Sequence, residues 1–312
     1  MNRKLISPIM LLLAAMIWGF AFAAQAAAST VPAFTLGAAR SFVAAIFLLI
    51  VIMVLDPVMK TGRRLFSRHG VDFNRYELIG GVIIGVILAA ASAFQQIGIN
   101  KGTDGGKAAF ITALYVCLVP IYSLVLKKRA PLNVWLGIAI SVAGFYLLCI
   151  TEELTMAPSD IFVLVASLIF PIHILTIDHF SQKCDGVRMS AIQFFTCALV
   201  NTVLALFTEM PLSTSILTEA LPYVIYLGVA SSGIAYTLQI IGQKGVAPAA
   251  ASIILSLESV FGVIGTAIFL GERMSLREYV GCGVVLVAVI LSQLDFTQIK
   301  NIITEKRRTG TK

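Results

Sequence analysis

The chain has 312 residues, of which 58% are hydrophobic and only 12% are charged, and its mean hydropathy is +0.93. A soluble domain carries about 25% charged residues, so this composition excludes a chain coated in water and predicts an integral membrane protein. The formal net charge of +7 does not indicate a nucleic-acid-binding surface, because the Lys and Arg residues gather on alternate connections between apolar segments.

Ten apolar stretches follow one another along the chain. Each is long enough to cross the roughly 30 Å hydrocarbon layer as a helix. Lipid cannot satisfy free backbone polar groups, so we expect all ten to be helical, and the short connections predict one all-α bundle with ten transmembrane helices. The predicted spans are residues 7–28, 33–55, 77–98, 107–126, 132–150, 159–178, 189–208, 220–241, 247–270 and 276–294.

The positive charges predict the orientation of this bundle. Most of the 23 Lys and Arg residues lie at the N-terminus, in the connections after the even-numbered spans, and in the tail. Cytoplasmic connections carry the excess of Lys and Arg, so we expect both termini on the cytoplasmic side of a cell membrane, inner or plasma. The cluster Lys127-Lys128-Arg129 and the basic tail at 299–312 are interpreted as topology anchors.

The second half of the chain repeats the first. The segment Gln96-Ile-Gly-Ile-Asn-Lys-Gly102 recurs 143 residues later as Gln239-Ile-Ile-Gly-Gln-Lys-Gly245, and the same offset pairs Tyr115 with Glu258. An odd number of crossings in each copy turns one copy upside down relative to the other. The sequence therefore predicts two inverted five-helix repeats related by an axis in the membrane plane. The predicted units are residues 1–155, residues 156–298 and the cytoplasmic tail.

Short motifs stand at regular places in this pattern. They are Ala15-Met-Ile-Trp18-Gly19-Phe20-Ala-Phe22 in the first span, Arg40 in the second, Leu114-Tyr115-Val-Cys-Leu-Val-Pro120 in the fourth, and Gly271-Glu272-Arg273-Met-Ser-Leu276 before the tenth. In order and spacing they resemble the drug/metabolite transporter superfamily, in its ten-helix EamA-type branch. The resemblance implies a carrier of small metabolites, often an exporter of amino acids or similar compounds, with a central cavity between the halves. The chain departs from the family at Ser259, where many relatives have proline.

Polar side chains in the apolar spans indicate which helix faces avoid lipid. In the eighth span they recur at helical spacing from Ser232 to Gln243, and a Trp near the midplane favours a cavity wall. The alternative is interhelical hydrogen bonding that only stabilises the bundle. The residues predicted to line a substrate cavity are Trp18, Gln96, Tyr115, Ser232, Tyr236, Gln239 and Glu258.

Three ionisable residues are predicted to lie inside the membrane. A carboxylate at the depth of Glu258 costs about 2.5 to 3.5 kcal/mol, so this residue should face protein or a water-filled cavity, either as a proton site or as a counter-charge for a substrate amine. The alternative is a structural hydrogen bond, for example to Tyr115. His173 could relay protons or be a packing residue, and Arg40 could recognise an anion such as a carboxylate or form a structural ion pair.

No motif predicts catalysis, a cofactor or a metal site. Gly105-Gly106-Lys107-Ala108 departs from a phosphate loop, because Lys101 stands where the first glycine is needed and Ala108 lacks the hydroxyl. We expect a non-enzymatic secondary carrier that works by alternating access, exports a small polar or amphipathic metabolite and is coupled to protons. We expect no nucleic-acid partner, and the oligomeric state stays open. The alternatives are an uncoupled facilitator or exchanger, and a non-transporting receptor or assembly subunit.

Overall fold

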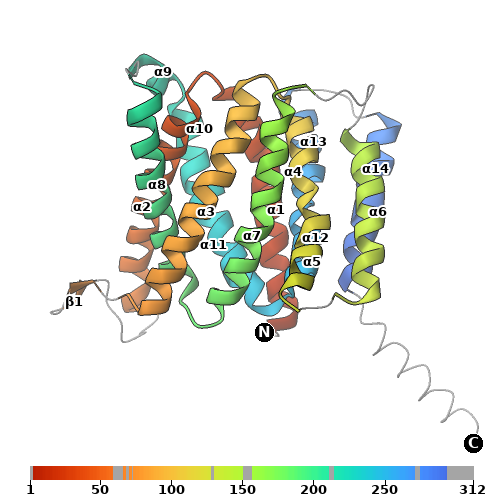
Figure 1. The fold of residues 1–312 in the computed structure, drawn as a ribbon, viewed down its shortest axis with the longest axis horizontal. Coiled ribbons are helices and arrows are strands. Elements are labelled where there is room, and N and C mark those ends of the chain that lie inside the picture. The colour runs from red at the N-terminus through yellow and green to blue at the C-terminus, as the bar shows by residue number, and fades with distance from the viewer. Residues whose placement is uncertain are drawn as a thin grey trace, which may run out of the picture.

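The structure is a computed structural model that describes residues 3–58, 66–67, 70–71, 73–127, 130–149, 157–210, 214–270 and 275–293. Within these residues the chain forms ten helical rods that stand side by side and alternate in direction (Figure 1). The basic tail, the motif Gly271-Glu272-Arg273, and Lys128 and Arg129 lie outside the described residues.

Each half of the chain supplies five rods. The first five are α1 (Arg3–Ala27), α2 (Ala33–Val58), α3 (Arg75–Asn100), the pair α4 (Gly105–Ala113) and α5 (Tyr115–Val125), and α6 (Leu132–Cys149). The second five are α7 (Asp160–Ser181), α8 (Gly186–Thr208), the series α10 (Leu221–Tyr226), η1 (Leu227–Ala235) and α11 (Tyr236–Gly242), the pair α12 (Pro248–Leu255) and α13 (Glu258–Leu270), and α14 (Leu276–Gln293). The remaining described elements are the antiparallel pair β1 (Phe66–Ser67) and β2 (Gly70–Val71), the short helix α9 (Thr214–Glu219) and the 3₁₀ turn η2 (Gln243–Gly245).

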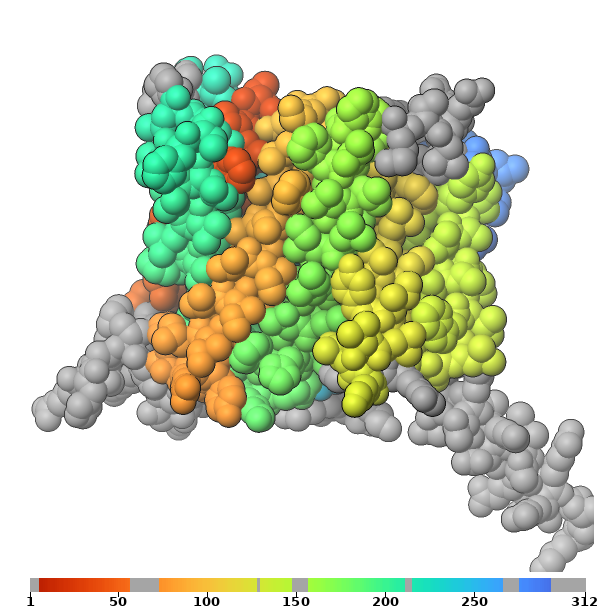
Figure 2. Space-filling model, viewed as in Figure 1, coloured from red at the N-terminus to blue at the C-terminus, as the bar shows by residue number. Residues whose placement is uncertain are grey.

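Most of the helical rods have the length and composition of membrane spans. Among the described residues, eight helical segments are long and apolar enough to cross a bilayer, and α6 contains a shorter apolar stretch at Leu132–Leu147. Large apolar side chains are exposed along the outer faces of the bundle, as lipid-facing surfaces require. Figure 2 shows α8, α3, α7, α5 and α6 in this order across one such face. The predicted all-α membrane bundle is confirmed.

The packing of the rods follows the internal repeat. α2 packs against its repeat partner α8, and α6 packs against its partner α14. In the repeat, α1 corresponds to α7, α3 to α11 and α5 to α13. The contact of α3 with α7 therefore corresponds to the contact of α11 with α1. In the same way, the contact of α13 with α1 corresponds to the contact of α5 with α7. These are the pairs that a two-fold axis in the membrane plane would exchange. The two five-helix repeats are therefore inverted relative to each other.

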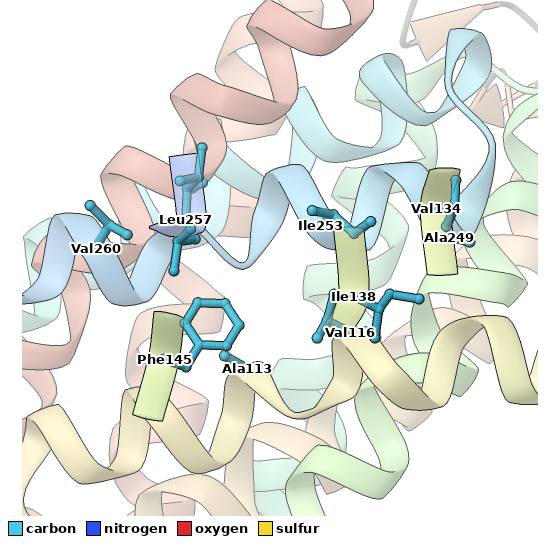
Figure 3. Close-up of a cluster of buried hydrophobic side chains, with 11 residues drawn as sticks. Ala113, Val116, Val134, Ile138, Phe145, Ala249, Ile253, Leu257 and Val260 are labelled. Atoms are coloured by element: carbon cyan, nitrogen blue, oxygen red, sulfur yellow. The ribbon is translucent and has the colours of Figure 1, made fainter. Parts of the chain in front are cut away.

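Two rods are broken at equivalent positions of the repeat. α4 ends at Ala113 and α5 begins at Tyr115, while α12 ends at Leu255 and α13 begins at Glu258. Proline does not cause these breaks, because Pro120 lies inside α5, beyond the break. The breaks place Tyr115 and Glu258 at the first positions of two half-helices in the interior of the bundle, and Leu257 at the second break packs against α6 and α14 in the apolar cluster of Figure 3.

A glycine brings α1 and α13 into close contact beside the second break. A Cβ atom on Gly19 would lie 2.5 Å from the Cβ of Phe261 and 2.7 Å from both the backbone oxygen of Glu258 and the backbone nitrogen of Gly262. Only a residue without a side chain fits against this backbone. The close approach fixes the depth and the rotation of Glu258 relative to Trp18, the neighbour of Gly19 in the chain.

Candidate functional site

A small cavity lies in the middle of the bundle, between the two repeats. Its volume is about 40 Å³, and its lining comes from α1, α2, α3, the α4–α5 pair, α7, the η1–α11 series and the α12–α13 pair. A water molecule needs roughly 10 to 15 Å³ of cavity volume, so the cavity has room for about three waters. A metabolite would have to widen it. Of the residues predicted from the sequence, those that line it are Trp18, Arg40, Tyr115, His173, Tyr236, Gln239 and Glu258.

Aromatic rings form one wall of this cavity. The ring centroids of Trp18 and Tyr236 are 4.6 Å apart, and His173 meets Tyr236 edge-on at 5.7 Å. The ring of Tyr115 lies 6.5 Å from that of Phe170. The indole nitrogen of Trp18 donates a 3.1 Å hydrogen bond to the backbone oxygen of Ser231, which fixes the ring across the boundary between the two repeats. Such a wall offers an amphipathic, rigid contact surface for a ligand.

Arg40 supplies the positive charge of the cavity. Its side chain is only 8% exposed, its Nε donates to the hydroxyl of Ser232 over 3.2 Å, and one terminal nitrogen donates to the side-chain oxygen of Gln25 over 3.5 Å. No ion pair to a carboxylate is present for Arg40 among the described residues. A buried cation surrounded by neutral groups is costly, and an anion in the cavity would relieve that cost.

Glu258 supplies a carboxyl group on the wall formed by the second broken rod. It is 5% exposed, and the hydroxyl of Tyr115 is its hydrogen-bond partner. Its Oε1 atom is buried and has no hydrogen-bond partner in the described residues. A buried carboxyl group with an unused oxygen can hold a proton or face a cationic ligand group.

Two of the residues predicted to line the cavity lie directly behind its lining. Ser232 holds Arg40, as described above. Gln96 donates from its side-chain nitrogen to the backbone oxygen of Gln25 over 3.3 Å and to Asn100 over 2.7 Å. Gln96 therefore supports the residue that accepts from Arg40.

Two polar lining residues, Gln25 and Ser231, were not predicted to line the cavity, and they hold Arg40 and Trp18. Each is a polar residue inside an apolar span, which is the signal that could have drawn attention to it. Two others, Gln95 and Thr112, are polar positions of the third and fourth spans that the sequence pattern also favoured, and the side-chain nitrogen of Gln95 donates to the hydroxyl of Thr112 over 2.9 Å. Gln193 lies behind the lining, and its side-chain oxygen is 3.2 Å from Nε2 of the lining residue His173.

The π-helix η1 explains why Ser231 faces the cavity. Residues in a π-helix are linked by hydrogen bonds from i to i+5, so the side chains turn by a different angle than in an α-helix. In a regular α-helix, Ser232 would lie on the same face as Tyr236 and Gln239. With η1 in place, Ser231 lines the cavity and Ser232 lies beside Arg40.

The described residues contain no group of three or more His, Cys, Asp or Glu side chains that could hold a metal ion.

Comparisons with known proteins agree with this architecture. A model of the EamA-like transporter family matches the chain twice, over residues 5–150 and 157–294. A protein of Archaeoglobus fulgidus described as an uncharacterized transporter is 28% identical over 94% of this chain and 87% of its own length. A second uncharacterized transporter, from Methanothermobacter thermautotrophicus, is 22% identical over 82% of this chain and 77% of its own length. A solved crystal structure has the same fold, with a TM-score of 0.73 and 14% identity over 92% of this chain and 96% of that one. The chain belongs to the EamA-like transporter family, within the drug/metabolite transporter superfamily.

Proposed function

We propose that this protein is a secondary carrier of small zwitterionic metabolites, of which amino acids are the simplest examples. The observation that supports this substrate class is the pair of ionisable groups in one cavity. Arg40 and Glu258 both line it, both are more than nine-tenths buried, and neither forms an ion pair among the described residues. A ligand with one carboxylate and one ammonium group would satisfy both.

The geometry around Arg40 suits a carboxylate. A guanidinium group presents five N–H donors, and Gln25 and Ser232 take two of them. The remaining donors are available for a bidentate contact to a ligand carboxylate. The aromatic wall of Trp18 and Tyr236 beside these groups would hold the apolar part of the ligand.

Alternating access would come from movement of one inverted repeat against the other around this cavity. The breaks before Tyr115 and Glu258 support this mechanism, because each divides a rod into two short helices that can tilt separately at the depth of the cavity. We propose that residues 1–155 and 156–298 act as the two moving units.

Proton coupling is assigned to Glu258, and export is the proposed direction. When a substrate amine binds, the carboxyl group of Glu258 would leave its contact with Tyr115 and bind the amine instead. Its proton would be released to the side from which the substrate enters. A proton entering down a 100 mV potential supplies about 2.3 kcal/mol. We place the carrier in the inner or plasma membrane with both termini on the cytoplasmic side, from the distribution of Lys and Arg.

A thermal-shift screen of amino acids, sugars and nucleosides on purified protein tests the substrate class. We expect stabilisation by a subset of amino acids, and we expect Arg40→Gln to abolish it. Arg277→Gln is the matched control, because Arg277 stacks on Tyr146 away from the cavity. Stabilisation by uncharged sugars alone, or equal stabilisation of Arg40→Gln, would contradict the proposal.

A further inference from the structure

Two contacts join α2 to α8, one at each end of this helix pair. At the end of α2, Asp56 forms an ion pair of 2.5 Å with Arg188 at the start of α8. At the other end, the carboxylate of Glu209, directly after α8, accepts hydrogen bonds from the backbone nitrogens of Phe34 and Thr35 at 2.9 and 2.7 Å, and from the Thr35 hydroxyl at 2.7 Å. Because α2 and α8 are antiparallel, the two contacts lie at opposite faces of the bundle.

The residues of these contacts are equivalent in the internal repeat. Glu209 stands 153 residues after Asp56, and Arg188 stands 153 residues after Thr35. The acidic residue at the end of one helix therefore meets the start of its repeat partner at both faces. The two contacts differ in the charge of the partner. The carboxylate of Asp56 faces a cation, whereas the carboxylate of Glu209 accepts from neutral donors.

The contact of Asp56 with Arg188 is largely buried and has an aromatic and an acidic neighbour. The Arg188 side chain is 2% exposed and that of Asp56 is 11% exposed. The Arg188 guanidinium also lies 5.7 Å from the ring of Phe73. Beside it, the buried carboxylate of Glu77, on α3, accepts from the backbone nitrogen of Asp185, the cap residue of α8. Separating a buried ion pair is strongly unfavourable, because each charge loses a close opposite charge in a poorly solvated place.

We propose that these repeat-equivalent contacts are a pair of gating latches, and that each must open when the cavity opens to its own face. Both join the first repeat to the second, and a carrier whose repeats rock against each other must break contacts between the repeats at the open face. The ionic latch Asp56–Arg188 and the neutral latch at Glu209 then set the balance between the two open states. This inference rests on the alternating-access function proposed above.

The test measures which face gives access to the cavity. Ala21, a small residue that lines it, is replaced by Cys in a chain whose five native cysteines have been removed. In proteoliposomes, a membrane-impermeant thiol reagent is then applied from each side in turn, and the ratio of the two labelling rates is the readout. Labelling of Ala21→Cys from both sides is the result that alternating access itself predicts.

Each latch is weakened by a substitution at one or the other of its two contacting residues. We expect Asp56→Asn and Arg188→Gln to favour labelling from the face where α1 begins. The ratio of the two labelling rates should change by about tenfold, which corresponds to a shift of about 1.4 kcal/mol between the two open states. Glu209→Gln and Thr35→Val should change the ratio in the opposite direction. The swap of Asp56→Arg with Arg188→Asp should return the ratio toward that of the starting protein, which a loss of folding would not do.

Glu278→Gln is the matched control. Its carboxylate also caps a helix start, through the backbone nitrogen and the hydroxyl of Ser275, but both residues belong to the second repeat. It should leave the ratio unchanged. If the two latches shift the ratio in the same direction, or no further than Glu278→Gln does, the latch assignment is overturned while the carrier function stands. If Ala21→Cys is never labelled from one side, the alternating-access function fails, and the latches fail with it.

Discussion

The hydroxyl of Tyr115 hydrogen-bonds with the carboxyl group of Glu258, and each of these residues begins the second helix of a broken rod. The two residues are equivalent in the internal repeat, so the contact lies close to the axis that relates the repeats. A contact at such a place is shared equally by both halves. Movement of one half against the other would change this contact, and it is here that we propose that a proton is coupled to transport.

Replacement of Glu258 by Gln should remove proton coupling. The amide keeps the size of the side chain and can still accept from Tyr115, but it cannot bind or release a proton in the working range. We expect a rate of transport in proteoliposomes that no longer responds to an imposed pH gradient, with little change in thermal stability.

Glu278→Gln is the control for this measurement, because it removes a carboxylate that lies outside the cavity and should leave the response to the pH gradient in place. An unchanged rate and pH dependence in Glu258→Gln would refute the coupling role. A carrier that transports but moves no protons in either form would be an uncoupled exchanger.

Gly19→Ala should destabilise the protein. The new Cβ would lie 2.5 Å from Phe261 and 2.7 Å from backbone atoms of α13, and backbone cannot move aside. Overpacking of this kind costs typically about 1 to 3 kcal/mol. Gly283→Ala is the matched control, because no atom lies within 4 Å of its new Cβ. Thermal unfolding in detergent checks both, and equal melting temperatures would contradict the close packing of α1 on α13.

Trp18→Phe should weaken the aromatic wall without unfolding the bundle. It keeps an aromatic ring but loses the N–H that donates to the backbone oxygen of Ser231. A hydrogen bond of this type contributes about 1 kcal/mol. We expect a small decrease in melting temperature and a weaker apparent affinity for substrate in counterflow. Full retention of affinity would show that the position of the ring does not matter to the ligand.

The sequence predicted the fold closely. The ten predicted spans and the observed rods agree in their ends to within a few residues, because the apolar runs have lengths set by the bilayer and end at polar connections. The repeat offset made Tyr115 equivalent to Glu258, and the hydrogen bond between them, considered from the sequence as the structural alternative for Glu258, is present. Burial of the intramembrane charges Arg40 and Glu258 followed from their cost in lipid.

The parts that could not be predicted are those where a rod departs from a regular helix. The breaks at Leu114 and at 256–257 carry no proline of their own, so nothing in the local sequence marks them. Within η1, the change of hydrogen-bond pattern shifts the polar stripe, so that Ser231 lines the cavity while Ser232 holds Arg40. On α3 the choice between Gln95 and Gln96 depends on the rotation of the helix, which the packing against α7 and α8 decides.

The orientation of the chain in the membrane can be tested directly. With ten crossings, the connection between α2 and α3 and the connection between α7 and α8 lie at the same face, where α1 begins. We expect single cysteines placed in both connections to be labelled from the cytoplasmic side. Labelling of the two from opposite sides would exclude ten crossings with inverted repeats.

The central claim is that the protein binds a zwitterion in one cavity between inverted repeats and carries it across the membrane. Its most direct test is counterflow: proteoliposomes are loaded with an unlabelled amino acid that stabilises the protein, and uptake of the labelled form is followed over time. We predict transient accumulation above equilibrium, its loss in Arg40→Gln, and its retention in Arg277→Gln. The absence of counterflow for every stabilising amino acid, or equal accumulation in Arg40→Gln, would contradict the account.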